Sequence, residues 1–233
     1  DNHIAVTDEK RYSKPQYFEE SYAFESAEDS SDTVDKTHIV MAWLLGNSTS
    51  LEDTMRARLL ASVLLDNSGS PLQNLLETTD LGTAPSPMCG LEDSQLELCF
   101  ACGIEGSNPE QADAVEAIVL QLLEEVAENG LPYEQVAASL HQLELSQREI
   151  TGGSYPYGLS LILTSLTSAT HRGAPVSLLD LDPVLDKLKQ EILNHHYIKS
   201  LARELLLDNQ HRIRLILKPD AQLANNKDQI EKD

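Results

Sequence analysis

The chain has 233 residues, a hydrophobic share of 41% and a formal net charge of −21 at pH 7, from 38 acidic and 17 basic residues. This length suits one large domain or two small ones, and the apolar share is sufficient for a hydrophobic core, so we favour one compact domain. A nucleic-acid partner is not expected, because so acidic a chain would not neutralise phosphates. The same charge could attract cationic peptides, although ordinary solubility is the simpler explanation.

A membrane partner is not expected either. No segment has the ~18 uninterrupted apolar residues of a spanning helix, and the first residues lack the cationic and apolar regions of a secretory signal. A domain cut from a longer protein would have lost its parent's targeting signal. The compartment is therefore left open, with the cytoplasm expected for a bacterial parent and an organelle for a eukaryotic one.

Cysteine use favours a reducing compartment, because the chain has three cysteines and an odd number cannot form a complete set of disulfides. Cys99 and Cys102 are three residues apart in a predicted strand, which places them on opposite faces. We expect buried structural cysteines rather than a metal or redox pair.

The first half of the domain begins with a polar, acidic lead-in over residues 1–36, in which one strand is predicted at about 17–24. A nearly continuous apolar, β-rich run at 37–45 predicts a buried strand. Ser50 is a suitable N-cap for a helix that continues to Leu65, with acidic residues in its first turn. A short helix is expected from Pro71.

The second half is mainly helical. Strands at about 82–89 and 95–106 are predicted to pair antiparallel. Asn108 and Gln111 predict a capping box at the start of a long helix that ends at Asn129-Gly130. Further segments follow: helices from Pro132, over 159–169, from a cap at Asp182 and around 198–205, then a strand over 211–217 and a polar tail at 221–233.

This order of elements predicts an α+β fold over residues 37–220, in which an antiparallel sheet is covered on one face by helices. Several blocks of sequence resemble those of a known family and follow one another in that family's order. They are Met41–Gly46, Ser70–Glu77, Leu81-Gly82, Leu143–Glu149, Thr151–Leu161 and Asn209–Asp220. In these blocks the chain resembles the second, non-catalytic domain of the presequence-protease branch of the pitrilysin/insulinase zinc metallopeptidase family. The resemblance implies the pitrilysin/processing-peptidase-like metallohydrolase fold.

The chain does not contain the zinc motif of that family. An inverted zincin needs two histidines four residues apart on one helix, a glutamate that activates water and a further carboxylate ligand. No His-x-x-Glu-His occurs, and at the best alignment the motif falls on Ala57–Ala61 of the 50–65 helix, which offers no imidazole or carboxylate. We therefore expect no catalytic residue, metal ligand or cofactor in this domain, and zinc elsewhere in the parent protein.

Two other histidine groups are weaker candidates. His141 and Glu144 have the spacing of the first histidine and the glutamate, but Leu145 replaces the second histidine and the helix is the wrong one by the family pattern. His195 and His196 are adjacent and cannot face one metal from a regular helix. We expect surface or interface residues at these positions.

Two glycine- and serine-bearing segments are candidate substrate contacts. By resemblance, the loop that contains Ser68, Gly69 and Ser70 corresponds to a glycine-rich loop near passing substrate in the inactive halves of processing peptidases. The second segment combines glycines, which permit close backbone approach, with tyrosines, which offer apolar area and hydroxyls. Its candidate residues are Gly152, Gly153, Ser154, Tyr155 and Tyr157. The alternative is a helix-breaking turn whose tyrosines pack beneath the sheet.

The resemblance implies a parent peptidase whose domains close around an unfolded peptide. This chain would form part of the chamber wall, pack against the zinc-bearing domain of the same parent and help to hold peptide. Two alternatives stay open. One is a free-standing inactive partner subunit of a two-chain processing peptidase, and the other is an enzyme with an unrecognised site that uses His141 and Glu144.

Overall fold

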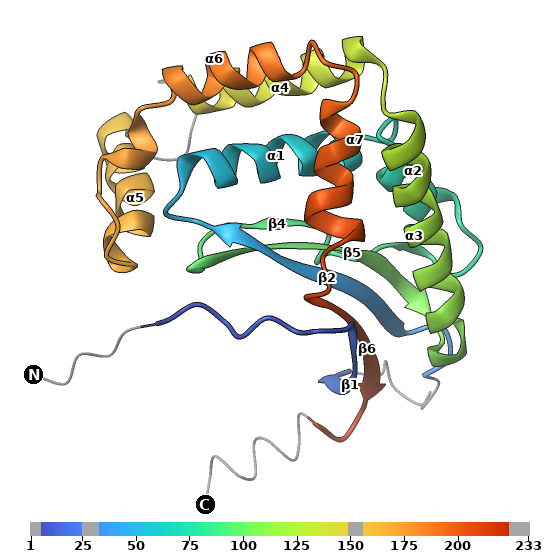
Figure 1. Ribbon diagram of the computed structural model, residues 1–233. Helices are drawn as coiled ribbons and strands as arrows, with labels where there is room; N and C mark the ends of the chain where they lie inside the picture. The colour runs from blue at the N-terminus through green and yellow to red at the C-terminus, as the bar shows by residue number, and fades with distance from the viewer. Residues whose placement is uncertain (1–5, 25–32, 149–155, 224–233) are drawn as a thin grey trace, which may run out of the picture.

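The computed structural model describes residues 6–24, 33–148 and 156–223, which form one sheet with helices gathered on one face (Figure 1). The strand order is β1-β6-β2-β5-β3, and β4 also pairs with β5. Every pair is antiparallel except β1–β6, which is parallel. The strands are β1 (Gln16–Ala23), β2 (Thr37–Asn47), β3 (Ala84–Pro85), β4 (Gly90–Glu92), β5 (Glu97–Ser107) and β6 (Arg212–Asp220).

The helices form two layers above the sheet. The inner layer includes α1, and α4 and α6 lie above α1, on the side away from the sheet (Figure 1). The helices are α1 (Leu51–Leu65), α2 (Pro71–Thr78), α3 (Ala112–Asn129), α4 (Tyr133–Arg148), α5 (Tyr157–Thr170), α6 (Asp182–Glu191) and α7 (Tyr197–Ala202). Short 3₁₀ turns occupy η1 (Pro109–Gln111) and η2 (Ser177–Leu179), and a π turn, η3 (Arg203–Leu207), follows α7.

The central strands position α1 through a buried apolar face. Ile39, Met41 and Trp43 of β2 alternate inward, as period-two side chains must, and are fully buried. Leu98, Phe100, Cys102 and Ile104 of β5 continue this face. Cys102 therefore lies in the core while Cys99 is half-buried on the opposite face, which confirms the separation expected for this pair.

The start of α1 is set by the predicted cap. The backbone N–H of Asp53 donates to Ser50 Oγ at 3.2 Å, and Glu52 and Asp53 lie in the first turn, where the helix dipole favours negative charge. Buried residues then occur along the whole helix, because α1 contacts the sheet on one side and other helices on the other. Capping and the apolar pattern together fix this helix at the predicted residues.

Only Ala84–Pro85 of the predicted 82–89 strand forms a strand, β3, and β4 begins after its predicted end. β3 and β4 both pair antiparallel with β5, but residues 86–89 turn between them. Pro85 and Pro87 lack the N–H that a continuous ladder would use, and Gly90 has a φ of 135°, a value that favours glycine. The expected antiparallel pairing with the 95–106 strand is confirmed for β3, and the pairing of β4 was not predicted.

Two predicted helix caps differ from the structure. Asn108 is the N-cap of η1 but makes no side-chain capping bond, and Asp182 is not the N-cap of α6. The Asn108 side chain donates to Asp35 Oδ1 at 2.6 Å, and η1 precedes α3 in place of a capping box. The Asp182 carboxylate binds Arg148 and belongs to the first turn of α6. In both cases a long-range partner competes with the local cap, which sequence spacing alone does not reveal.

Candidate functional site

The helix on which the family resemblance places the zinc motif has core side chains at the aligned positions. Ala57 and Leu60 of α1 are 2% and 1% exposed and belong to the hydrophobic core, while Ala61 is half-buried beside it. These side chains offer no ligand atom for zinc, so the metal implied by the family does not fit here. Within the described residues, no group of three or more His, Cys, Asp or Glu side chains could hold a metal ion.

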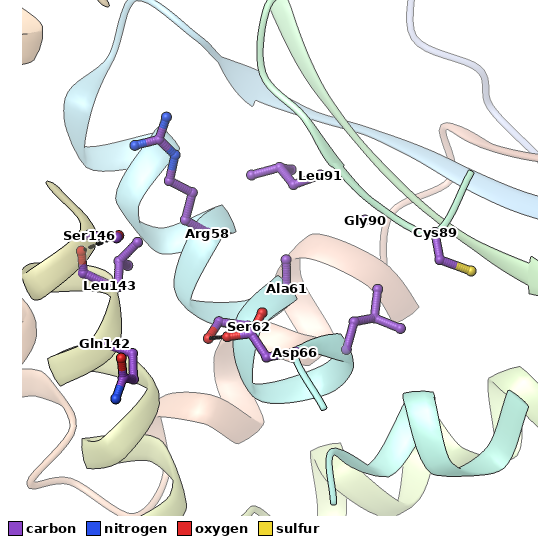
Figure 2. Close-up of a pocket in the computed structure, with 11 residues that line it drawn as sticks. Arg58, Ala61, Ser62, Asp66, Cys89, Gly90, Leu91, Gln142, Leu143 and Ser146 are labelled. Carbon is purple, nitrogen blue, oxygen red and sulfur yellow. Dashed lines mark hydrogen bonds between the residues drawn. The ribbon is translucent and has the colours of Figure 1, made fainter. Parts of the chain in front are cut away.

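A cavity of about 580 Å³ lies beside Ala61, between α1, α4 and the β4 segment (Figure 2). One face of α1 lines it at helical spacing with Arg58, Ala61, Ser62, Leu65 and Asp66. The other walls come from α4 and from the start of β4. They consist of Gln142, Leu143, Ser146, Cys89, Gly90 and Leu91.

Hydrogen bonds hold several polar groups of this cavity. Ser62 Oγ donates to Asp66 Oδ2, and Arg58 donates from Nε and Nη2 to Asp93 Oδ2 at 3.0 and 2.7 Å. Burial raises the pKa of the Cys89 thiol, which keeps it in the neutral, poorly nucleophilic form. No histidine lines the cavity among the described residues. The arrangement is suited to binding through apolar contact and hydrogen bonds, and lacks a nucleophile–base pair.

The first candidate substrate segment lies directly after the cavity-lining residue Asp66. Ser68 and Gly69 are exposed, whereas Ser70 is 2% exposed and its N–H donates to Asn67 O at 2.7 Å. The loop is ordered by its own contacts, since Gly69 N–H also donates to Asn67 Oδ1. Ser68 and Gly69 are therefore accessible to a ligand, and the Ser70 side chain is enclosed.

The second candidate segment follows α4, whose residue Ser146 lines the same cavity. Gly152, Gly153, Ser154 and Tyr155 lie outside the described residues. Tyr157 begins α5 and is 42% exposed, which places its ring at the surface rather than beneath the sheet.

The remaining histidine candidates are surface residues. His141 is exposed, and Glu144 is engaged by Lys189 at 2.8 Å and by Arg148 at 3.0 Å. Hydrogen bonds and charge from these two cations lower the pKa of Glu144, the larger effect coming from Lys189. His195 and His196 are also exposed. Glu144 is thus part of an ion-pair group that joins α4 to α6.

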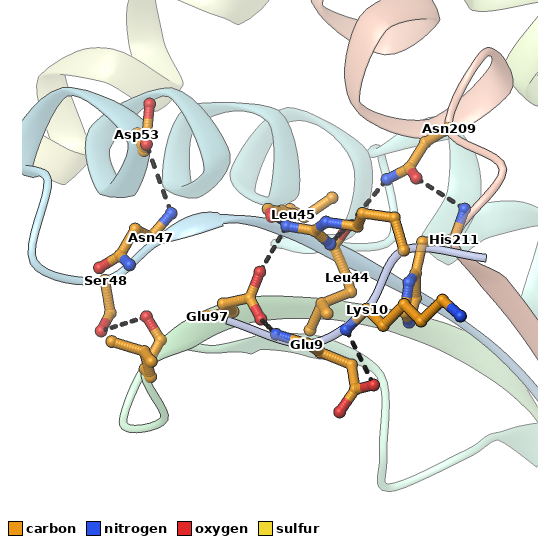
Figure 3. A network of polar contacts seen from close by, with 12 residues as sticks. Glu9, Lys10, Leu44, Leu45, Asn47, Ser48, Asp53, Glu97, Asn209 and His211 are labelled. Carbon is orange, nitrogen blue, oxygen red and sulfur yellow. Dashed lines mark hydrogen bonds and ion pairs between the residues drawn. The ribbon is translucent and has the colours of Figure 1, made fainter. Parts of the chain in front are cut away.

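A second polar group closes the end of the sheet beneath α1, where the lead-in crosses β2 and β5 (Figure 3). The Glu97 carboxylate accepts hydrogen bonds from the Glu9 N–H and from Arg11, and Arg11 also donates to Leu44 O and Leu45 O. Glu97 is only 8% exposed. Its charge is therefore compensated by the docked lead-in, as a buried carboxylate requires.

The docked lead-in also contacts His211. The Tyr12 N–H donates to His211 Nδ1 at 3.1 Å, and the two rings stack with centroids 4.0 Å apart. Burial, assisted by the nearby Arg11 charge, lowers the pKa of His211, while Glu9 and Glu97 oppose this shift. Nδ1 must be unprotonated to accept this hydrogen bond, so the neutral form is the one that the fold stabilises.

We expect the domain to lose stability as pH falls below the His211 pKa of the unfolded chain, about 6.5. The folded-state pKa is lowered, so the unfolded state binds the proton first and the contribution of His211 is complete only above that value. Urea unfolding at pH 7.5, 6.5 and 5.5 would measure this for the wild type and for His211→Asn, whose Oδ1 is a permanent acceptor. If the unfolding free energy of the wild type changed with pH in parallel with that of His211→Asn, His211 would not be the source of the pH dependence.

Sequence spacing could have suggested part of the cavity. The residues of α1 that line it recur at i, i+3, i+4, i+7 and i+8, a stripe of small and polar side chains on a helix that is otherwise buried. The contributions of Cys89, Gln142 and Ser146 depend on how distant segments meet. Sequence reasoning did not identify these residues.

The family described as Peptidase M16 inactive domain matches residues 5–143, more than half of the chain. This chain belongs to that family. The match confirms the predicted resemblance, and it identifies this M16 domain as the non-catalytic type, in agreement with the core side chains at the zinc-motif positions.

Curated relatives of this M16 inactive domain include presequence proteases. The mitochondrial presequence protease of Xenopus laevis is 28% identical over 100% of this chain and 22% of that protein. Presequence protease 1 of Arabidopsis thaliana, described as chloroplastic/mitochondrial, is 29% identical over 99% and 21% respectively. Protein HypA of Clostridium perfringens is 26% identical over 90% and 21%. The chain therefore spans about a fifth of the length of these relatives.

Solved structures confirm the fold of the M16 inactive domain. The peptidase M16 inactive domain from Pseudomonas fluorescens superposes with a TM-score of 0.58 at 14% identity, over 93% of this chain and 46% of that chain. A protease from Helicobacter pylori gives a TM-score of 0.61 at 15% identity, over 94% and 48%. The predicted α+β class, with a sheet covered by helices, is thereby confirmed. Within the described part of the chain, no helix has the length and apolar character to cross a bilayer.

Proposed function

We propose that this M16 inactive domain is a non-catalytic part of a zinc metallopeptidase of the presequence-protease type. It packs against the zinc-bearing domain of the same parent and forms part of the wall of the peptide chamber. The observation that carries the proposal is the structure of α1, where Ala57 and Leu60 occupy the zinc-motif positions and are enclosed in the core. A helix of this kind supports a fold and cannot hold a metal.

A role in holding unfolded peptide is supported by the cavity beside Ala61. It combines apolar walls with amide, hydroxyl and guanidinium groups, and its lining residue Asp66 is followed closely in sequence by the exposed residues Ser68 and Gly69. A peptide offers both apolar side chains and backbone hydrogen-bonding groups, which such a surface can engage. The net charge of −21 favours basic peptides over acidic ones.

The comparisons favour a domain of a long chain over a free-standing partner subunit. The presequence proteases contain this region within single chains about five times as long, because it covers 21% and 22% of two of them. Because most of such a long chain lies outside this region, we assign zinc to another domain of the parent. For a eukaryotic parent we propose an organelle, since those relatives are described as mitochondrial or chloroplastic, and for a bacterial parent the cytoplasm.

The proposal is tested by separating and recombining the domains. We expect the isolated chain to bind no stoichiometric zinc and to leave a quenched peptide uncleaved. Co-expressed with the zinc-bearing domain of its parent, it should form a stable complex. That complex should cleave a basic peptide with a lower KM than the zinc-bearing domain alone, because the second wall adds binding contacts.

Each part of the proposal has its own contrary result. Stoichiometric zinc with chelator-sensitive cleavage by the isolated chain would exclude a non-catalytic role. Separate elution of the two domains at micromolar concentration would exclude the domain pair. An unchanged KM in the complex would leave the packing role intact and remove the peptide-holding role.

A further inference from the structure

Helix α5 is an uncharged helix with exposed apolar side chains. Its 14 residues, Tyr157–Thr170, include no charged side chain, although 24% of the whole chain is charged. Figure 1 shows α5 at one end of the molecule, away from the sheet. Within the described residues, its main packing is against the single turn η2.

The apolar stripe of α5 faces outward. Leu159, Ile162, Leu163 and Leu166 recur at i, i+3, i+4 and i+7, the spacing that places side chains on one helix face. Their exposed fractions are between 38% and 57%. A stripe of this kind normally packs on the core of its own domain, whereas the described residues of this chain leave it exposed.

The end of α5 is attached to the following turn through Ser168. Ser168 is fully buried, and its Oγ donates to Ala174 O at 3.0 Å, while Gly173 N–H donates to Ser168 O at 2.8 Å. These bonds tie the end of α5 to the turn that follows it. The C-terminal end of α5 is therefore fixed to the domain while the stripe stays exposed.

An apolar pocket of about 220 Å³ lies beside the stripe. Leu161, Ile162, Leu166 and Ala169 of α5 form one side and Pro175 the other, with Ser165 as the polar member. Val176, next to Pro175, is 70% exposed. The pocket has room for a large apolar side chain, so the surface offers both a stripe for a facing helix and a recess for an anchor residue.

We propose that the α5 stripe docks the adjoining folded domain of the same parent, through an uncharged apolar face that places one side chain in the Pro175 pocket. This inference rests on the proposed function and assigns the element that makes the domain contact. The same fold in the Pseudomonas fluorescens and Helicobacter pylori structures makes up 46% and 48% of chains about twice as long, so a similar length of chain is available there to cover such a face.

Charge distinguishes this occupant from two others. A second copy of the chain would bring a further net charge of −21 to the contact, and an anionic lipid surface would be repelled by the same charge. A helix without a cation also lacks the groups that hold interfacial helices on lipid headgroups. Depletion of charge is typical of the centre of permanent protein interfaces, which matches a covering domain.

The experiment compares hydrogen exchange of the α5 amides in the isolated chain and in the full-length parent. We expect exchange in the parent to be slower by at least about tenfold, because a covered helix opens less often. Leu163→Glu in the parent should abolish this protection, since it places a charge in the apolar contact. Thr164→Glu is the matched control, because it adds the same charge on the same turn outside the stripe and should leave the protection unchanged.

Several results would overturn the assignment. Equal exchange in the two proteins, or protection that survives Leu163→Glu, would exclude α5 as the docking element even if the domain pair forms. Dimers of the isolated chain that Leu163→Glu dissociates in sedimentation would assign the stripe to a second copy. Protection that arises only on adding a basic peptide would assign it to substrate. In the isolated chain both variants should unfold at wild-type urea concentrations, which separates a lost contact from a lost fold.

Discussion

Replacing Trp43 with alanine is expected to lower the free energy of unfolding of this domain by about 3–5 kcal/mol, measured by urea denaturation. Trp43 is fully buried at the centre of β2, and its ring lies 6.0 Å from that of Phe100 on β5. Its indole Nε1–H donates to Leu206 O at 2.9 Å. The change would remove a large part of the ~5–15 kcal/mol that stabilises a typical domain.

Two further variants test the reason for this loss. Trp43→Phe retains much of the apolar area but leaves Leu206 O without its indole donor, so we expect a smaller loss. Leu193→Ala, at a residue that is 56% exposed, should change stability by less than about 0.5 kcal/mol. A loss for Trp43→Ala no larger than that of Leu193→Ala would contradict the central role of this side chain.

The elements that sequence predicted well are those fixed by local signals. The α1 helix begins at a serine cap and continues through an apolar pattern, and the structure has it at Leu51–Leu65. The α3 helix ends at Gly130, whose φ of 75° is easily adopted by glycine. Such features depend on neighbouring residues, so a single sequence contains the information that determines them.

The parallel pairing of β1 with β6 was not predicted, because it joins segments from opposite ends of the chain. Gln16 lies opposite Ile213, and the register continues to Ala23 opposite Asp220. The hydrophobic pattern of β1 is weak, since most of its residues are exposed. A strand of this kind forms because it can pair with an edge strand of the sheet. That edge strand is in place only after the rest of the fold is formed.

For the candidate site, the sequence predicted which metal ligands are missing but did not predict the cavity. The lack of ligands at Ala57–Ala61 follows directly from residue types, and the buried environment of Ala57 and Leu60 agrees with it. The cavity beside Ala61 was not predicted, because it needs α1, α4 and the β4 segment to meet at particular angles. The outward stripe of α5 was missed for a related reason, since an apolar helix pattern predicts a buried face without saying which body buries it.

The ion-pair group around Glu116 is a further case in which local sequence did not identify a distant partner. The extent of α3 was predicted from its ends, but Glu116 lies on its buried side with only 10% of its side chain exposed. Its partners are Arg212 and Arg214 of β6, 96 and 98 residues along the chain. A charged residue on a buried helix face therefore required a partner that local sequence did not identify.

Replacing Glu116 with alanine is the second change for which we expect a large effect, a loss of about 3–5 kcal/mol in the free energy of unfolding. Arg212 Nη2 and Arg214 Nη1 each lie 2.9 Å from a Glu116 carboxylate oxygen, and these arginine side chains are only 12% and 14% exposed. Removing the carboxylate would leave two poorly hydrated cations close together. Arg214 would keep its exposed partner Asp113, which is too well hydrated to replace the buried carboxylate.

Asp113 supplies the matched control, because it binds the same Arg214 at 2.6 Å but is 92% exposed. Asp113→Ala should cost less than about 1 kcal/mol, as expected for a pair screened by water. Arg214 also lies 4.6 Å above the Tyr17 ring of β1, so loss of Glu116 should increase hydrogen exchange in β1 and β6 before it affects β5. Equal losses for Glu116→Ala and Asp113→Ala, with β1 unchanged, would show that burial of this carboxylate does not hold α3 to the sheet.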